Sequence, residues 1–207
     1  MGKFARWQHR RKPWQQGNWL AVDIETNGLD AKNDAMLTLA WVPIRPPVIA
    51  LDQHGYKVVK SSEVLSQAAV IHQLSSADLA AGEPLEDVMH AFKQVAENAL
   101  LVAHNVRFDF EVLQVALAKL GHERWHPDGL YCTLQAERRR LLRAQQELQQ
   151  GELTLAACRA RYGLAEFNGH HALNDAIACA ELFLAQAYRF ASGHQPTVAT
   201  LLKSARP

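Results

Sequence analysis

Four acidic residues stand at positions from which their side chains could together hold cations. Asp23 and Glu25 are two residues apart in the apolar stretch WLAVDIE, and residues two apart on a β-strand share a face. Asp109 closely follows the apolar run LLVAH, and Asp175 closely follows a histidine pair in NGHHALND. Taken singly, each acid is explained as well by a helix N-terminus, a turn or a solvated surface. Four acids converge only where cations neutralise them, because close carboxylates raise one another's pKa.

Two neighbouring histidines, His170 and His171, precede the last long helical stretch of the chain. An imidazole titrates near neutral pH and can therefore take up a proton during a reaction. The local stretch does not decide which of the two rings takes part in chemistry, so their role depends on partners elsewhere in the chain.

The elements that would position these side chains follow from hydrophobic periodicity and turn residues. Short runs of apolar and β-forming residues predict five strands, and stretches with helical spacing that end near glycine predict six helices. The order, strands first and then strands mixed with helices, predicts an α/β fold with one mixed five-stranded sheet flanked by helices. The predicted strands are 19–25, 35–44, 46–51, 56–60 and 100–104, and the predicted helices are 75–82, 83–99, 108–121, 132–151, 153–163 and 171–193.

Composition limits the class of protein. The chain has 207 residues, 48% of them hydrophobic, and a formal net charge of +1, which suits one domain and excludes a uniformly basic surface for nucleic acid. Three cysteines without CxxC spacing, Cys132, Cys158 and Cys179, are typical of reduced intracellular thiols. No run reaches the ~18 apolar residues of a membrane span, and no signal peptide is recognisable. We therefore expect a cytoplasmic protein with no membrane contact.

Three motifs carry a resemblance to a known family. In this order and spacing, VDIETNGL, HNVRFDFEVL and HHALNDAIACAELF resemble the motifs of the DnaQ-like 3′→5′ exonucleases of the DEDDh class. The resemblance covers Trp19 to about Ala187, and it implies a ribonuclease H-like fold. It also implies an enzyme that hydrolyses nucleic acid from the 3′ end to nucleoside 5′-monophosphates, with single-stranded DNA as the expected substrate and RNA as the close alternative.

The resemblance also assigns roles within the site. It implies that Asp23, Glu25, Asp109 and Asp175 hold two Mg²⁺ or Mn²⁺ ions, the ions that all-oxygen carboxylate ligands suit. It makes His170, five residues before Asp175, the general base. On a helix an offset of five places two side chains roughly 140° apart, so His170 can reach the site only from the loop before the helix. We expect the neighbouring Gly169 to give that loop its freedom, and His171 to face solvent or pack near the helix start.

By the same resemblance, a second group of residues seats the terminal nucleotide. The members are Thr26, Asn27, Leu29, His72 and Phe108, although core packing explains Leu29 and Phe108 almost as well, and an isolated His72 is usually a core histidine. The chain departs from the family pattern at three positions. Asn27 replaces the usual threonine, Gln67 stands where many relatives have a glutamate, and Cys132 stands where an aspartate often precedes threonine. None of the three departures removes a metal ligand.

The ends of the chain flank the predicted exonuclease domain, residues 19–192. Residues 1–18 form a basic and aromatic leader, which is either a solvated segment, a surface that stacks on single-stranded nucleic acid, or a contact for a protein partner. Residues 193–207 form a tail shorter than a polymerase-binding tail, which favours a stand-alone enzyme over a proofreading subunit. In the alternative from another class, the chain is a non-catalytic module that binds nucleic acid or a polymerase, but such a module has no reason to retain all five site residues.

Overall fold

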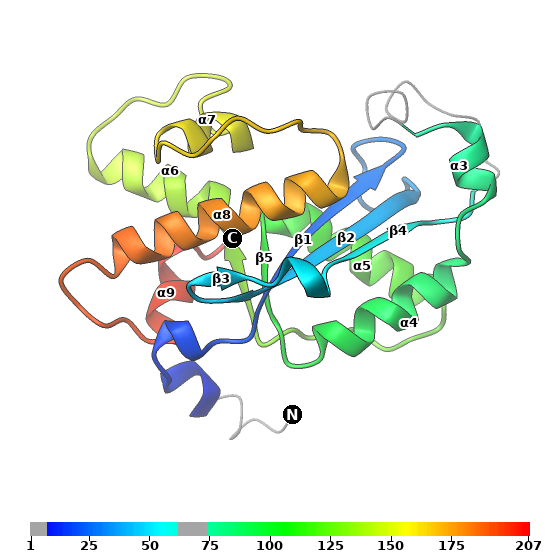
Figure 1. Cartoon of the computed structure of the whole chain (residues 1–207), viewed down its shortest axis with the longest axis horizontal. Coiled ribbons are helices and arrows are strands. Elements are labelled where there is room, and N and C mark those ends of the chain that lie inside the picture. Colours follow the sequence, from blue (N-terminus) through cyan, green and yellow to red (C-terminus); the bar gives the residue numbers. More distant parts are fainter. Residues whose placement is uncertain (1–7, 62–73) are drawn as a thin grey trace.

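The computed structural model describes residues 8–61 and 74–207. In this part of the chain, helices cover both faces of one mixed sheet (Figure 1). The sheet runs in the order β3-β2-β1-β5-β6, and β4 also pairs with β2. The strands are β1 (Trp19–Thr26), β2 (Met36–Arg45), β3 (Val48–Ile49), β4 (Gly55–Val58), β5 (Leu100–Ala103) and β6 (Gly129–Cys132).

The central strand, β1, is buried along almost its whole length. It pairs antiparallel with β2 and parallel with β5. Residues of even number, such as Leu20 and Val22, pack in the core on one face, whereas Trp19 and Ala21 pack in the core on the other. This alternation is the period of two that a strand requires, and it places Asp23 on the same face as Trp19 and Ala21.

Helices α4 and α5 cover the first of these faces, and α8, α9 and η1 cover the second. The apolar side of α4 contributes Val88, Met89 and Phe92 to the first core, and α8 contributes Cys179 and Phe183 to the second. The helices are η1 (Trp14–Gln16), η2 (Leu51–Gln53), α3 (Ser76–Ala80), α4 (Leu85–Ala96), α5 (Val106–Lys119), α6 (Thr133–Arg143), α7 (Leu155–Ala160), α8 (Ala172–Phe190) and α9 (Val198–Ser204).

The predicted fold class is confirmed, and each of the five predicted strands is present, but the strand count was wrong. The sheet of the described chain has six strands. The predicted count was one too low because the sequence did not indicate the four-residue β6. Two helices also differ from the prediction. Helix α6 ends at Arg143 instead of continuing to residue 151, since the glutamine-rich stretch that follows has too few apolar residues to pack a further turn. Helix α9 was not predicted.

Both end segments pack onto the domain where they are described. Trp14 is fully buried, its ring lies 5.0 Å from that of Tyr188, and its backbone carbonyl accepts a hydrogen bond of 2.8 Å from the Trp19 indole. The amide of Val198 donates to the carbonyl of Lys12 at 2.9 Å. The expectation of a wholly solvated leader is therefore wrong at Trp14, which fixes the segment to the domain, although most residues of 8–18 are exposed or half-buried. The two buried indoles cannot stack on nucleic acid. The division of the chain at residues 18 and 193 stays a prediction.

Candidate active site

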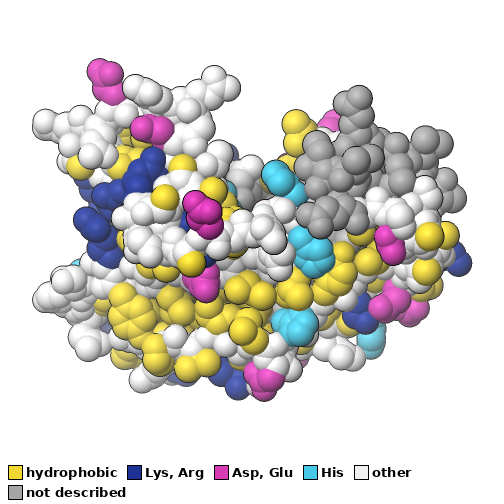
Figure 2. All heavy atoms as spheres, turned by 45° about the horizontal axis from the view of Figure 1, so that its top comes forward, with side chains coloured by type: hydrophobic (Ala, Val, Ile, Leu, Met, Phe, Trp, Pro, Cys, Tyr) yellow, Lys and Arg dark blue, Asp and Glu magenta, His cyan; other side chains and the backbone are white. Residues whose placement is uncertain are grey.

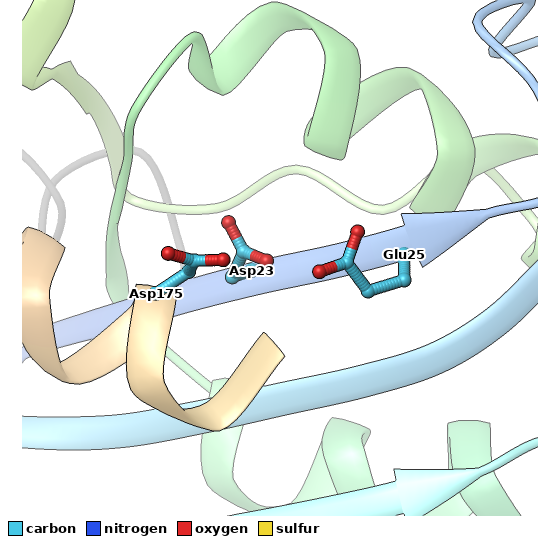
Figure 3. Close-up of side chains that lie close together, drawn as sticks. All are labelled: Asp23, Glu25 and Asp175. Atoms are coloured by element: carbon cyan, nitrogen blue, oxygen red, sulfur yellow. The ribbon is translucent and has the colours of Figure 1, made fainter. Parts of the chain in front are cut away.

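Three carboxylates meet at the end of the central strand. Asp23 and Glu25 extend from β1 and Asp175 extends from the first turn of α8, and Figure 3 shows the three side chains side by side above β1. One oxygen from each lies within 4.8 Å of the others. An arrangement of this size can surround a cation.

The strand and helix geometry explains why these acids meet. Asp23 and Glu25 stand opposite Ala40 and Thr38 of β2, on the face of β1 that α8 covers. Asp175 comes four residues after His171, the N-cap residue of α8, so its side chain lies at the helix end nearest the carboxyl end of β1. The register of β1 against β2 shifts after Glu25, and the strand ends at the next residue.

Asp109 is the fourth predicted acid and lies in the first turn of α5. A sharp turn at Asn105, whose φ is +75°, separates α5 from the end of β5 and returns the chain toward β1. Asp109 is only 4% exposed. It is not one of the three carboxylates within 4.8 Å, but its charge raises the pKa of Asp23, so it belongs to the same electrostatic group.

Burial and mutual repulsion shift these acids in one direction. Burial, followed by the charges of Asp109, Asp175 and Glu25, raises the pKa of Asp23 well above its usual value. Burial raises the pKa of Asp109 to about 8, against backbone hydrogen bonds that lower it. Burial and the charge of Glu25 raise the pKa of Asp175 to about 6. Protons therefore compete with any cation for this site near neutral pH.

The two histidines have different surroundings. His170 is exposed, and its backbone amide donates a 2.8 Å hydrogen bond to Oδ2 of Asp175. His170 has a φ of +66° and is the residue with left-handed backbone in this loop, whereas Gly169 is not. The expectation that Gly169 would supply the conformational freedom of the loop was therefore wrong. The ring of His171 stacks on Tyr56 at 4.7 Å, which confirms the expectation that it packs near the helix start.

The Tyr56–His171 stack leaves one polar atom without a partner. Nδ1 of His171 is buried and has no hydrogen-bond partner in the described structure. Sequence reasoning missed Tyr56, because nothing in the stretch around it indicates that a residue of β4 packs on the histidine pair.

The residues predicted to seat a nucleotide fall into three groups. Leu29 is 95% exposed, which excludes the core-packing alternative for this residue. Phe108 lines the same open depression of 770 Å³ as Leu29, but it also packs against the core. Thr26 and Asn27 are tied to the loop, since the Thr26 hydroxyl donates to the Gly28 carbonyl and the Asn27 side chain accepts from the Ala35 amide. His72 and Gln67 lie outside the described residues.

A basic residue that sequence reasoning did not single out lies at the same depression. Arg107 lines it together with Leu29 and Phe108. Arg107 stands within the second motif, HNVRFDFEVL, two positions before Asp109. This position could have indicated a basic residue near the substrate.

Residues 20–183 match the family model of the RNase T type, which describes exonucleases. The chain therefore belongs to this exonuclease family. Among curated relatives, it is 26% identical over 171 residues to the PolC-type DNA polymerase III of Thermotoga petrophila, covering 83% of this chain but 12% of the polymerase. It is 29% identical over 193 residues to ribonuclease T of Haemophilus ducreyi, covering 81% of this chain and 84% of the relative.

Solved structures confirm the fold. Escherichia coli exonuclease I in complex with a dT13 oligonucleotide superposes with a TM-score of 0.69 and 18% identity, over 85% of this chain and 43% of that one. Cell-death related nuclease 4 superposes with a TM-score of 0.72 and 16% identity, over 87% of this chain and 66% of that one. Within the described residues, no helix has the length and apolar character needed to cross a membrane.

Proposed function

We propose that this chain is a metal-dependent exonuclease that removes nucleotides from the 3′ end of single-stranded DNA. The observation that carries the proposal is the convergence of Asp23, Glu25 and Asp175 within 4.8 Å, with buried Asp109 close enough to affect the pKa of Asp23. Membership of the exonuclease family supports the nuclease chemistry. Polarity and substrate are taken from the motif resemblance.

The donor set fits a hard divalent cation. All donors are carboxylate oxygens, which Mg²⁺ and Mn²⁺ prefer. Burial and neighbouring carboxylates raise the pKa values of Asp23 and Asp175, and a bound cation would offset that repulsion. Asp23, Glu25 and Asp175 would hold the ion or ions, with Asp109 behind them. When bound, the metal ions would supply charge stabilisation at the phosphoryl oxygens and acidify water.

The side chains of this chain would supply the other parts of the reaction. His170 would accept a proton from the attacking water as the water oxygen bonds to phosphorus. The bond from phosphorus to the 3′-oxygen breaks, and that oxygen takes up a proton, which leaves a shortened strand and a nucleoside 5′-monophosphate. Leu29 and Phe108 would hold the terminal base and sugar, since they line one depression.

RNA is the second candidate substrate, and one observation favours it. Ribonuclease T of Haemophilus ducreyi matches over most of both chains, whereas the match to the PolC-type polymerase covers 12% of that protein. The DNA proposal rests on the motif resemblance; residues 67 and 72, which are predicted to lie at the terminal sugar, are outside the described part of the chain. A non-catalytic module is disfavoured, because the predicted acids converge and His170 contacts Asp175 through its amide.

The experiment compares labelled single-stranded DNA, duplex DNA and RNA of equal length, each incubated with the protein in Mg²⁺ or EDTA. We expect a stepwise ladder from 5′-labelled single-stranded DNA in Mg²⁺, slower cleavage of RNA and no cleavage in EDTA. Release of the 5′ label as a mononucleotide in the first turnovers would reverse the polarity. Faster cleavage of RNA would replace DNA as the substrate.

Matched histidine variants test the assignment of the base. His170→Ala should lower the rate by roughly two to four orders of magnitude, the usual range for loss of a general base, while His171→Ala changes it little. Circular dichroism of both variants checks that the fold is retained, since the His171 ring packs on Tyr56. The reverse ranking of the two variants would overturn the role of His170.

A further inference from the structure

A second concentration of charge lies at the end of the molecule opposite the acids. A cavity of 310 Å³ opens where α6, the C-terminal end of α8 and α9 meet. Four of its lining residues are arginines, Arg139, Arg140, Arg143 and Arg189, and none is acidic. Figure 2 shows basic side chains gathered at the end of the molecule where α6 and the C-terminal end of α8 lie. We call this cavity the arginine pocket.

One buried acid below the arginine pocket orients part of it. Glu137 is fully buried and binds Arg140 through two hydrogen bonds of 3.0 and 2.6 Å. The hydroxyl of Tyr162 donates to Glu137 at 3.0 Å, and Arg161 lies 3.6 Å from its other oxygen. A single carboxylate thus faces two guanidinium groups, and the charge of the pocket remains strongly positive.

The remaining arginines are not neutralised. Within the described chain, Arg143 and Arg189 form no ion pair with a carboxylate. Arg139 donates to the backbone carbonyl of Lys203 at 3.1 Å. Like charges that line one cavity repel one another unless an anion lies between them. The planar guanidinium group matches the oxygens of a phosphate. The arginine pocket therefore suits phosphate oxygens.

The aromatic residues of the pocket argue against a site for a base. Tyr131 is 1% exposed, so its ring is not accessible. The guanidinium carbons of Arg140 and Arg189 each lie 5.8 Å from the centre of the Tyr162 ring, and they occupy the space in which a base would stack. Among the aromatic lining residues, the half-buried Phe190 has no guanidinium group over its ring in the described structure, so the pocket offers contacts chiefly to phosphates.

The dimensions favour a strand over a single phosphate. Arg139 and Arg143 are four residues apart on α6, about 6 Å along the helix axis, which is wider than one phosphate needs. Asp175 and Arg189 lie 14 residues apart on α8, so the active site and the arginine pocket are about 21 Å apart along that helix. A stacked strand with a rise of about 3.4 Å per nucleotide covers this distance in about six nucleotides.

We propose that the arginine pocket binds the phosphodiester backbone of the substrate strand about six nucleotides from its 3′ end. This inference rests on the proposed function for its substrate and adds a second contact that depends on strand length. A strand too short to reach the pocket loses that contact but still fills the active site.

The test compares the variant Arg143→Ala/Arg189→Ala with a matched control, Arg45→Ala/Lys60→Ala, which removes two exposed basic residues elsewhere on the surface. Binding of fluorescein-labelled dT12 and dT3 is measured by anisotropy in EDTA, where hydrolysis is blocked. We expect about tenfold weaker binding of dT12 by the pocket variant, and a slope of log affinity against log salt smaller by about 1.4, the contribution of two contacts to a single strand. Binding of dT3 and the control variant should be unchanged.

A second variant and further measurements distinguish a strand contact from loss of folding, from binding of small anions and from failure of the proposed function. Arg143→Glu serves as a second variant, because Arg143 is exposed and its replacement leaves the buried Glu137 group intact. Equal binding of dT12 by wild type and both variants overturns the proposal. Loss of dT12 and dT3 binding in equal measure also overturns it. If inorganic phosphate stabilises wild type but not the variant, and dT12 affinity is the same, the pocket binds small anions and the strand contact is wrong. Length-dependent binding by a wild-type protein that cleaves no DNA or RNA would refute the proposed function alone.

Discussion

Replacing Asp109 by asparagine should make the metal-free protein more stable and the stability less dependent on pH. Asp109 is 4% exposed, and burial raises its pKa from 3.8 to about 8. An acid whose pKa is raised by folding binds its proton more tightly in the folded state. Its contribution favours the folded state at low pH and is lost as the pH rises from about 4 to about 8.

The magnitude follows from the same pKa values. At 1.36 kcal/mol for each pH unit, the loss between pH 4 and pH 8 has an upper bound of about 5 kcal/mol. The favourable effect of an acid in the first turn of α5 is about 0.3–1 kcal/mol, so the effect of burial is larger. Asp109→Asn has no charge to bury and should escape the loss. For a chain of this size, each kcal/mol corresponds to about 2–4 °C in melting temperature.

Thermal melts of wild type and Asp109→Asn in EDTA at pH 4, 6 and 8 would measure this difference. The two proteins should melt together at pH 4, and the variant should melt higher by several degrees at pH 8. Asp87→Asn is the matched control, because Asp87 also lies in the first turn of a helix but is exposed; it should change stability by less than about 1 kcal/mol at every pH. A difference between wild type and Asp109→Asn that does not grow with pH would refute the reasoning.

Three further predictions concern the metal, the N-terminal segment and the exposed Leu29. Adding Mn²⁺ should raise the melting temperature of wild type through ligand linkage, and Asp23→Asn/Asp175→Asn should show no such rise; a rise in both would place the ion elsewhere. Trp14→Ala should lower the free energy of unfolding in urea by about 3–5 kcal/mol, because the ring is fully buried. Leu29→Ala, at an exposed position, should leave stability unchanged and raise the KM for DNA; equal losses of stability in both variants would contradict the packing assigned to Trp14.

Local patterns were enough to place the acids on their elements, and the resemblance of the three motifs assigned them to one site. The spacing of Asp23 and Glu25 fixes their common face on β1, and the positions of Asp109 and Asp175 near helix starts follow from the apolar runs beside them. The degree of burial of Asp109 was not predictable, since it depends on how α5 packs against a strand 80 residues earlier in the chain. The separation of the two histidines into an exposed and a stacked ring likewise depends on Tyr56 of β4.

The missed elements have a similar cause. Strand β6 has four residues and is stabilised by parallel pairing with β5, which no local pattern contains. The leader was interpreted from its basic and aromatic composition, but Trp14 is buried by Phe183 and Tyr188 from the opposite end of the sequence. Composition indicates that such a segment could be solvated, whereas only tertiary packing shows that Trp14 fixes it to the domain.

The packing of the N-terminal segment against the last helices has a consequence for synthesis of the chain. Trp14 contacts Phe183, 169 residues later, so at about 5–20 residues per second a ribosome needs roughly 10–30 s to supply the partner. During that interval the Trp14 indole has not yet met the aromatic residues that bury it. Asp23 and Glu25 on β1 are likewise made before Asp175, the third carboxylate of the group. The acidic group is completed only when α8 has been made, so a nascent or prematurely ended chain should hold no working nuclease site.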